Sequence, residues 1–153
     1  VNYKGIAGMK NMEAHENYNR HHNDIRVENG INYGDVLSGV DFNYAAKLTA
    51  VNVISLATIA SSPKPPENLK IGGIVEPSVK FRWDHPADDS VSGYKIYWRE
   101  TTSSTWDYSR LVNKLNNYTL DGIVIDNFIF GISTVNSKGF ESLVTFPQGT
   151  FRD

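Results

Sequence analysis

A short proline-rich segment divides this chain into two parts of different character. Three of the four residues 63–66 are proline, and serines occupy positions 61 and 62. Proline lacks a backbone N–H and fixes its own φ angle, so the segment ends any preceding helix and favours an extended, semi-rigid connector. The sequence therefore predicts a first part over residues 1–62, a linker over residues 63–66 and a second part over residues 67–148.

Short stretches of alternating apolar and polar residues fill the second part, separated by turn-forming residues roughly every 8–12 positions. Alternation with a period of two places one side of a strand in a core. The pattern is typical of a β-sandwich and predicts seven short strands and no helix over residues 67–147, with a last edge strand near residues 143–146. The alternating apolar sets are Val79, Phe81 and Trp83; Tyr94, Ile96 and Trp98; and Phe128, Phe130 and Ile132.

The first part has a different pattern. Residues 6–12 suit one short strand, and residues 13–34 are polar and almost without period, which indicates a functional loop or disorder. Asp41 is a suitable N-cap for a helix over residues 42–60 that is apolar on most sides and needs burial on most sides. Lys47 and Asn52 interrupt the apolar surface of this helix, and a length of about 20 residues is only the minimum needed to cross a bilayer. We therefore expect no membrane-spanning helix. Nothing else in residues 1–60 is large enough to cover this helix, which predicts a missing partner or a dimer.

Composition excludes several classes of function. The 15 Lys+Arg and 17 Asp+Glu give a net charge of −2, which predicts no nucleic-acid or anionic-lipid surface. Without cysteine the chain has no disulfide, thiolate metal site or cysteine nucleophile. No glycine-rich phosphate loop and no serine nucleophile is recognisable. The chain begins with Val1 and shows no signal-type apolar segment, so we expect a fragment or a processed product.

Two adjacent histidines in the polar stretch are the main candidates for chemistry. His21 and His22 precede Asp24, and a neutral imidazole with nearby carboxylates suits zinc. Two solvated loop histidines are the more common reading of the local pattern alone. Weaker candidates, better interpreted as parts of hydrated turns, are His15, His85 and the acidic pairs Asp24/Glu28 and Asp88/Asp89.

Four runs in the second part match a known family. They are FRWDHP at residues 81–86, GYKIYWR at 93–99, LDG at 120–122 and FIFGISTVN at 128–136. They resemble the strands and corner of a fibronectin type III module. The family's corner tyrosine is Phe128 here, so the corner hydrogen bond from its hydroxyl is missing and we expect a less constrained loop. Tyr97, Trp106 and Tyr108 would form a sugar- or protein-binding surface if exposed, although such residues more often cover the sheet.

Runs in the first part match a second family. They are ENYNRHHNDIRVENG at residues 16–30, YGD at 33–35, VDFNYAAKL at 40–48 and VN at 51–52. They resemble the end of the catalytic domain of zinc-dependent aminopeptidases, the metallopeptidase family twenty-eight, in which a late histidine completes one of two zinc sites. The resemblance implies His22 as the ligand, because it lies two residues before Asp24, with His21 as the alternative. In the family an Asp-Thr pair commonly follows this histidine by a few residues. Here Asp35-Val36 takes the place of that pair, and an insertion separates it from the histidines.

The resemblance implies the chemistry of a parent protein. Two zinc ions would polarise the scissile carbonyl and activate a bridging water, with a Glu base moving the proton. The other ligands and this base would precede Val1, so we expect an inactive C-terminal fragment, unable to hold zinc, of a secreted or periplasmic aminopeptidase that hydrolyses N-terminal residues from peptides. Tyr18 would hydrogen-bond a reaction intermediate, although a packing tyrosine is the more common reading.

The predicted fold class is therefore mainly β. A fibronectin type III-like β-sandwich is preceded by a strand, a long loop and a helix from the end of an α/β zinc-peptidase domain. The alternative is a stand-alone extracellular fibronectin type III-like module that binds a protein or a glycan, with the helix as an interface.

Overall fold

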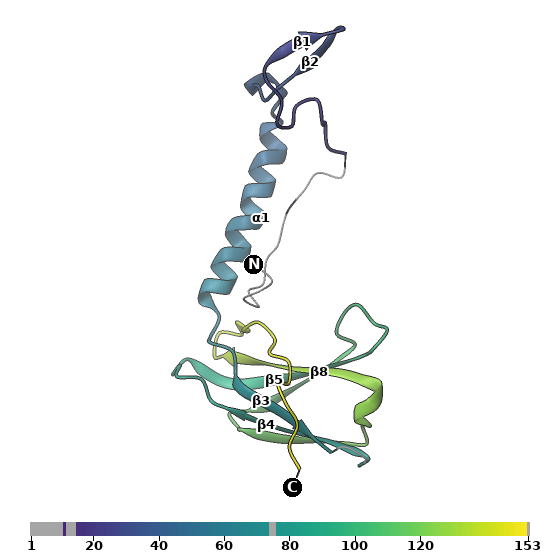
Figure 1. Ribbon diagram of the computed structural model, residues 1–153. Helices are drawn as coiled ribbons and strands as arrows, with labels where there is room; N and C mark the ends of the chain where they lie inside the picture. The colour runs from purple at the N-terminus through teal and green to yellow at the C-terminus, as the bar shows by residue number, and fades with distance from the viewer. Residues whose placement is uncertain (1–10, 12–14, 74–75, 153) are drawn as a thin grey trace. The chain divides into compact units, whose positions relative to one another are not determined.

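The computed structural model describes residue 11, residues 15–73 and residues 76–152, and it contains two compact units, Val1–Leu56 and Ala57–Asp153 (Figure 1). The first unit holds a small hairpin and most of a long helix, and the second holds a sandwich. The strand predicted over residues 6–12 lies outside the described residues, apart from Asn11.

The polar stretch of the first unit contains a hairpin that was not predicted from the sequence. Strand β1 (Arg26–Glu28) pairs antiparallel with β2 (Ile31–Tyr33). The two turn residues, Asn29 and Gly30, have φ angles of 52° and 77°, and positive φ at both positions is what a type I′ turn requires. The Asn-Gly pair was therefore the signal for this hairpin. A 3-10 turn, η2 (Leu37–Gly39), follows it.

The long helix α1 (Phe42–Ser61) begins where it was predicted to begin. Asp41 caps it, because its Oδ1 accepts a hydrogen bond from the backbone N–H of Tyr44 at 3.0 Å. The helix ends one residue later than expected, shortly before Pro63. It is long and apolar enough to cross a membrane, a property that core helices of soluble proteins share. None of its residues is buried within the described part of the chain.

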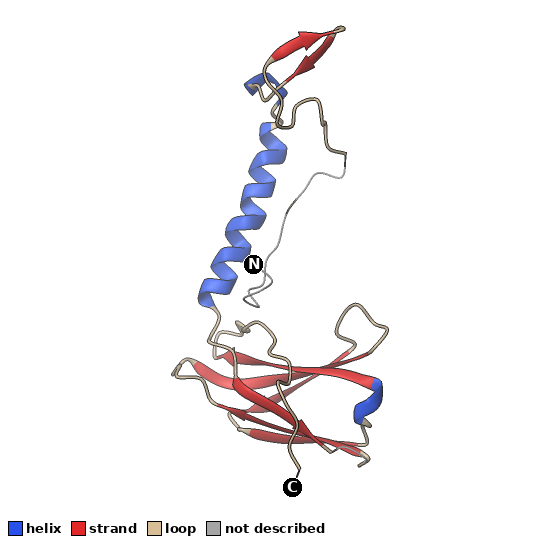
Figure 2. Cartoon of the chain, in the orientation of Figure 1, coloured by secondary structure: helices blue, strands red, loops and turns tan. Residues whose placement is uncertain are grey.

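The second unit is a sandwich of two antiparallel sheets (Figure 2). One sheet has the order β3-β4-β7, and the other has the order β6-β5-β8. The first is made of β3 (Glu67–Gly72), β4 (Ser78–Asp84) and β7 (Asn117–Asp121). The second is made of β5 (Val91–Glu100), β6 (Tyr108–Asn113) and β8 (Phe128–Asn136).

Two details of the sandwich differ from the prediction of seven strands and no helix. The last edge strand is reduced to isolated bridges, Val135–Glu141 and Ile132–Thr145. A single 3-10 turn, η3 (Ile125–Asn127), precedes β8. Phe128 follows this turn, and its ring lies 6.4 Å from that of Tyr108 and 6.2 Å from that of Phe130.

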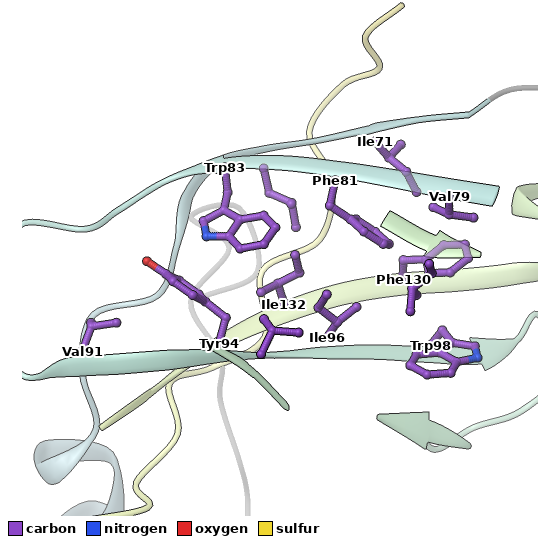
Figure 3. Close-up of a cluster of buried hydrophobic side chains, with 13 residues drawn as sticks. Ile71, Val79, Phe81, Trp83, Val91, Tyr94, Ile96, Trp98, Phe130 and Ile132 are labelled. Atoms are coloured by element: carbon purple, nitrogen blue, oxygen red, sulfur yellow. The ribbon is translucent and has the colours of Figure 1, made fainter. Parts of the chain in front are cut away.

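The core lies between the two sheets, and the predicted alternation supplies most of it (Figure 3). The rings of Trp83 and Tyr94 lie 5.0 Å apart, and those of Phe81 and Phe130 meet edge to face at 5.5 Å. Burial of each such side chain contributes about 1.5–3 kcal/mol. The other buried members are Leu69, Ile71, Val79, Val91, Ile96, Trp98, Val112, Leu120 and Ile132.

Strand β8 is buried on both faces, which alternation alone does not predict. Its residues 130–134 are all buried. The segment after the strand covers the second face, since a Cβ on Gly131 would collide with the side chain of Val144. Glycine is therefore required at this position.

The proline-rich segment is held on the sandwich. Its first and last prolines are buried. The N–H of Lys64 donates to Asp88 Oδ2 at 2.8 Å, and Thr134 Oγ1 donates to the carbonyl of Lys64 at 2.7 Å. The pKa of Asp88 is lowered by the hydroxyl of Ser90 and by the backbone N–H groups of Lys64 and Ser90. These bonds make the segment part of the second unit.

Candidate functional site

The histidine pair lies in a tightly bonded turn of the first unit. The N–H of His21 donates to the carbonyl of Tyr18 at 3.3 Å. The side-chain amide of Asn23 donates to the carbonyls of Tyr18 and His21, at 2.9 and 3.0 Å. His22 has a φ of 53°, in the left-handed region. In this conformation the two imidazole rings lie 4.1 Å apart, centroid to centroid.

A hollow of about 580 Å³ opens beside His21. Its lining includes Glu16, Asp35 and Asp41, whereas His22 is not among the lining residues. Glu16 Oε1 lies 3.2 Å from His21 Nδ1. A carboxylate on one ring nitrogen fixes the orientation of an imidazole and leaves the other nitrogen for a ligand, which is the usual arrangement around a metal-bound histidine.

The described residues do not complete a zinc site. Within residues 11, 15–73 and 76–152, no three His, Asp or Glu side chains lie close enough together to hold a metal ion. A catalytic zinc takes three protein ligands, so the residues described here do not fit the metal without further ligands. Tyr18 is 72% exposed, and its ring lies 6.5 Å from that of His21.

Three of the weaker candidates, His85, Glu28 and Asp88, have structural partners. His85 Nδ1 lies 2.5 Å from the hydroxyl of Tyr94 at one end of the core. Glu28 pairs with Arg26 across 3.1 Å on the exposed hairpin. Asp88 binds the proline-rich segment through Lys64. Each contact accounts for its residue without a catalytic role.

A polar cluster on the sandwich was not recognised in the sequence. Glu141 accepts hydrogen bonds from Lys95 Nζ at 2.9 Å, from the Tyr97 hydroxyl, and from Ser133 Oγ at 3.3 Å. Burial raises the pKa of Glu141, but the hydrogen bonds from Tyr97 and Lys95 outweigh this effect and the net pKa is lowered. The hydrogen bond to Glu141 in turn raises the pKa of Lys95. Glu141 lies far from Lys95 and Tyr97 in the sequence, so no local pattern reveals the cluster.

Replacing Glu141 by Gln is expected to destabilise the sandwich by about 1 kcal/mol at neutral pH, because a neutral amide is a weaker acceptor than a carboxylate. The folded-state pKa lies below the ordinary value of 4.5. The stabilisation by the carboxylate is therefore fully present above that pH and is lost as pH falls through the folded-state pKa. Urea unfolding at pH 7 and pH 3 measures this, with exposed Glu100→Gln as the control. An equal loss of unfolding free energy in Glu141→Gln at both pH values would contradict the assignment of this stabilisation to the ionised carboxylate.

The aromatic residues proposed as a binding surface mostly cover the sheet. Tyr97 and Trp106 are half-buried, with ring centroids 5.5 Å apart. Trp106 also packs against Phe146 at 5.8 Å. Tyr108 is 49% exposed and stacks on Trp98 at 5.5 Å. The structure therefore shows packed rings here and no free aromatic platform.

The sequence profile of the fibronectin type III domain matches residues 64–147, more than half of the chain. The chain belongs to the fibronectin type III family. The match begins inside the proline-rich segment, in agreement with the hydrogen bonds that hold this segment on the fibronectin type III domain.

Similar proteins extend beyond the fibronectin type III domain. A probable zinc metalloprotease of Pyrenophora teres f. teres (strain 0-1) is 34% identical over 144 residues, covering 94% of this chain and 30% of that protein. Another, from Leptosphaeria maculans (strain JN3 / isolate v23.1.3 / race Av1-4-5-6-7-8), is 34% identical over 146 residues, covering 94% of this chain and 34% of that protein. The chain therefore spans about a third of the length of the curated relatives it matches.

Solved structures resemble the fibronectin type III domain at low identity. A Fn3-like protein from Clostridium thermocellum is 17% identical with a TM-score of 0.47, covering 61% of this chain and 99% of that chain. The fn3 domain of the human collagen alpha-1(XX) chain is 19% identical with a TM-score of 0.45, covering 61% of this chain and 90% of that chain.

Proposed function

We propose that this chain is the C-terminal part of a secreted zinc aminopeptidase. It would contribute the end of the catalytic domain and a fibronectin type III domain. The observation that carries the proposal is the extent of the similarity to proteins named probable zinc metalloproteases. That similarity covers 94% of the chain, and so includes the histidine turn and α1 as well as the sandwich.

In this proposal the histidine pair supplies one zinc ligand of the longer protein. The sequence run favours His22, whereas the Glu16 contact and the position beside the hollow favour His21. The remaining ligands and the catalytic base belong to the part of the protein that this chain does not span. The chain alone is then inactive, because one imidazole does not hold a catalytic zinc.

The exposed helix supports the same proposal. Helix α1 is apolar on most sides, and Val53, Ile54, Leu56 and Ile59 are between 57% and 68% exposed. Burial of each such side chain is worth about 1.5–3 kcal/mol, so a helix of this composition needs a cover. We propose that the rest of the catalytic domain covers it, while the fibronectin type III domain orients or docks that domain.

The proposed function is tested by assaying the full-length protein on matched peptides with a free or an acetylated N-terminus. We expect release of the N-terminal residue from the free peptide only, and loss of this activity on chelation of zinc. The 153-residue chain should release nothing. Cleavage inside the acetylated peptide would contradict aminopeptidase activity, and no cleavage of either peptide would contradict peptidase activity altogether.

A further inference from the structure

One asparagine of the sandwich stands in the acceptor sequence for an N-linked glycan. Asn117 is followed by Tyr118 and Thr119, and no other asparagine of the chain is followed two positions later by serine or threonine. The sequence Asn-x-Ser/Thr, in which x is any residue but proline, is where glycans are attached to asparagine in secreted proteins. Because so short a motif also occurs by chance, its position in the fold decides whether it is usable.

The fold presents this sequence to solvent. Asn117 is the first residue of β7, directly after the short connection at residues 114–116. Asn117 and Thr119 are exposed, whereas Leu120 is 2% exposed and Tyr118 packs against the core. Alternation along the strand therefore turns the acceptor amide and the hydroxyl two residues later to the outer face of the sheet.

A glycan on this amide meets no buried group. The side-chain amide of Asn117 donates to Asn116 Oδ1 at 2.9 Å, and this contact is exposed. A glycan replaces one of the two amide hydrogens, so the other hydrogen can keep this bond. A hollow of about 380 Å³, lined in part by Asn117 and Thr119, opens beside the amide and leaves room for the first sugar.

The glycan would also lie at the open edge of a sheet. In the order β3-β4-β7, both β3 and β7 are edge strands. The C-terminal segment covers β3, since the N–H of Ile71 donates to the carbonyl of Gly149 and the N–H of Phe151 donates to the carbonyl of Ile71, both at 3.0 Å. Within the described part of the chain, β7 pairs with β4 alone. An uncovered edge strand is a template for pairing with another molecule, and proteins usually block it.

We propose that Asn117 carries an N-linked glycan and that this glycan shields the β7 edge. In the transfer, the amide nitrogen of Asn117 forms a bond to the anomeric carbon of an oligosaccharide carried on a polyisoprenyl pyrophosphate. The bond from that carbon to the pyrophosphate oxygen breaks, the lipid pyrophosphate leaves with the electron pair, and one amide proton passes to solvent. Nothing is oxidised or reduced. The inference rests on the secretion contained in the proposed function and not on its zinc chemistry.

The test is to secrete the full-length protein from a yeast host and to analyse its peptides by mass spectrometry, before and after peptide N-glycosidase, which converts a glycosylated asparagine to aspartate. We expect Asn117 to be modified in most molecules. Thr119→Ala should abolish the glycan although Asn117 is retained, and Thr119→Ser should keep it. Asn116→Gln is the control, because it changes the adjacent exposed asparagine and leaves the acceptor sequence intact.

The same samples test the shielding of the β7 edge. Enzymatic removal of the glycan from the folded protein should increase its self-association, measured by light scattering at equal concentration, with the thermal unfolding midpoint recorded for each variant. Unmodified Asn117 in the secreted, folded protein, or a glycan that persists in Thr119→Ala, would overturn the site. Unchanged self-association would overturn the shielding role.

Peptidase activity is assayed on the same protein, which separates this inference from the proposed function. A glycosylated protein without peptidase activity would contradict the proposed function alone. An active, secreted protein without the glycan would overturn this inference alone, and a full-length protein that is not secreted would contradict both.

Discussion

Replacing Phe81 by alanine is expected to lower the free energy of unfolding of the fibronectin type III domain by about 3–5 kcal/mol. Phe81 is 1% exposed and its ring meets that of Phe130 edge to face. Truncation removes the transfer free energy of the ring and leaves a cavity that the two sheets cannot fully close. The total stability of a domain is typically about 5–15 kcal/mol, so this single change removes a large part of it.

Urea unfolding followed by circular dichroism measures this loss. Phe146→Ala is the matched control, because it deletes the same ring from a residue that is 52% exposed. We expect the control to lose about 1 kcal/mol or less, mainly from its contact with Trp106. Equal losses in the two variants would show that the core does not lie between the sheets as described.

If the proposed function is right, replacing the proposed histidine ligand by alanine in the full-length protein is expected to lower kcat/KM at least about 100-fold. Even the loss of a residue that only orients a metal ligand typically costs about 10–100-fold. His21→Ala and His22→Ala are made separately. One should lose zinc and activity, and the other should change far less. If His21 is the ligand, Glu16→Gln should also weaken activity by about tenfold, because the 3.2 Å contact orients this imidazole.

Zinc content and kcat/KM are measured together for each histidine variant. His15→Ala is the control, because His15 is an exposed histidine of the same unit. Wild-type zinc content and activity in both His21→Ala and His22→Ala would remove the histidine pair from the proposed site.

Local sequence patterns were enough to predict the sandwich and the helix start. Alternation in residues 78–84 and 91–100 is confirmed because one side of each strand faces the core. The cap by Asp41 is confirmed because capping depends only on neighbouring residues. The hairpin at Asn29-Gly30 was missed, although its turn signal is equally local.

The polar cluster around Glu141 and the contacts of the C-terminal segment were harder to predict, because they join residues that are distant in sequence. Glu141 meets Lys95 across 46 positions, and Phe151 reaches Arg82 only because the C-terminal segment pairs with β3. The role of the histidine pair is harder still to predict from local sequence. Among the described residues no three candidate ligands lie together around the pair, so neither a local pattern nor this part of the structure shows whether it binds a metal.

We propose that this chain is part of a zinc enzyme whose remaining ligands lie elsewhere in a longer protein. The most direct test is to measure zinc per molecule by elemental analysis, in the full-length protein and in the 153-residue chain purified side by side. We expect the full-length protein to retain bound zinc after dialysis and the chain alone to lose it. A full-length protein without zinc, or a chain that retains zinc through His21 or His22 alone, would contradict it.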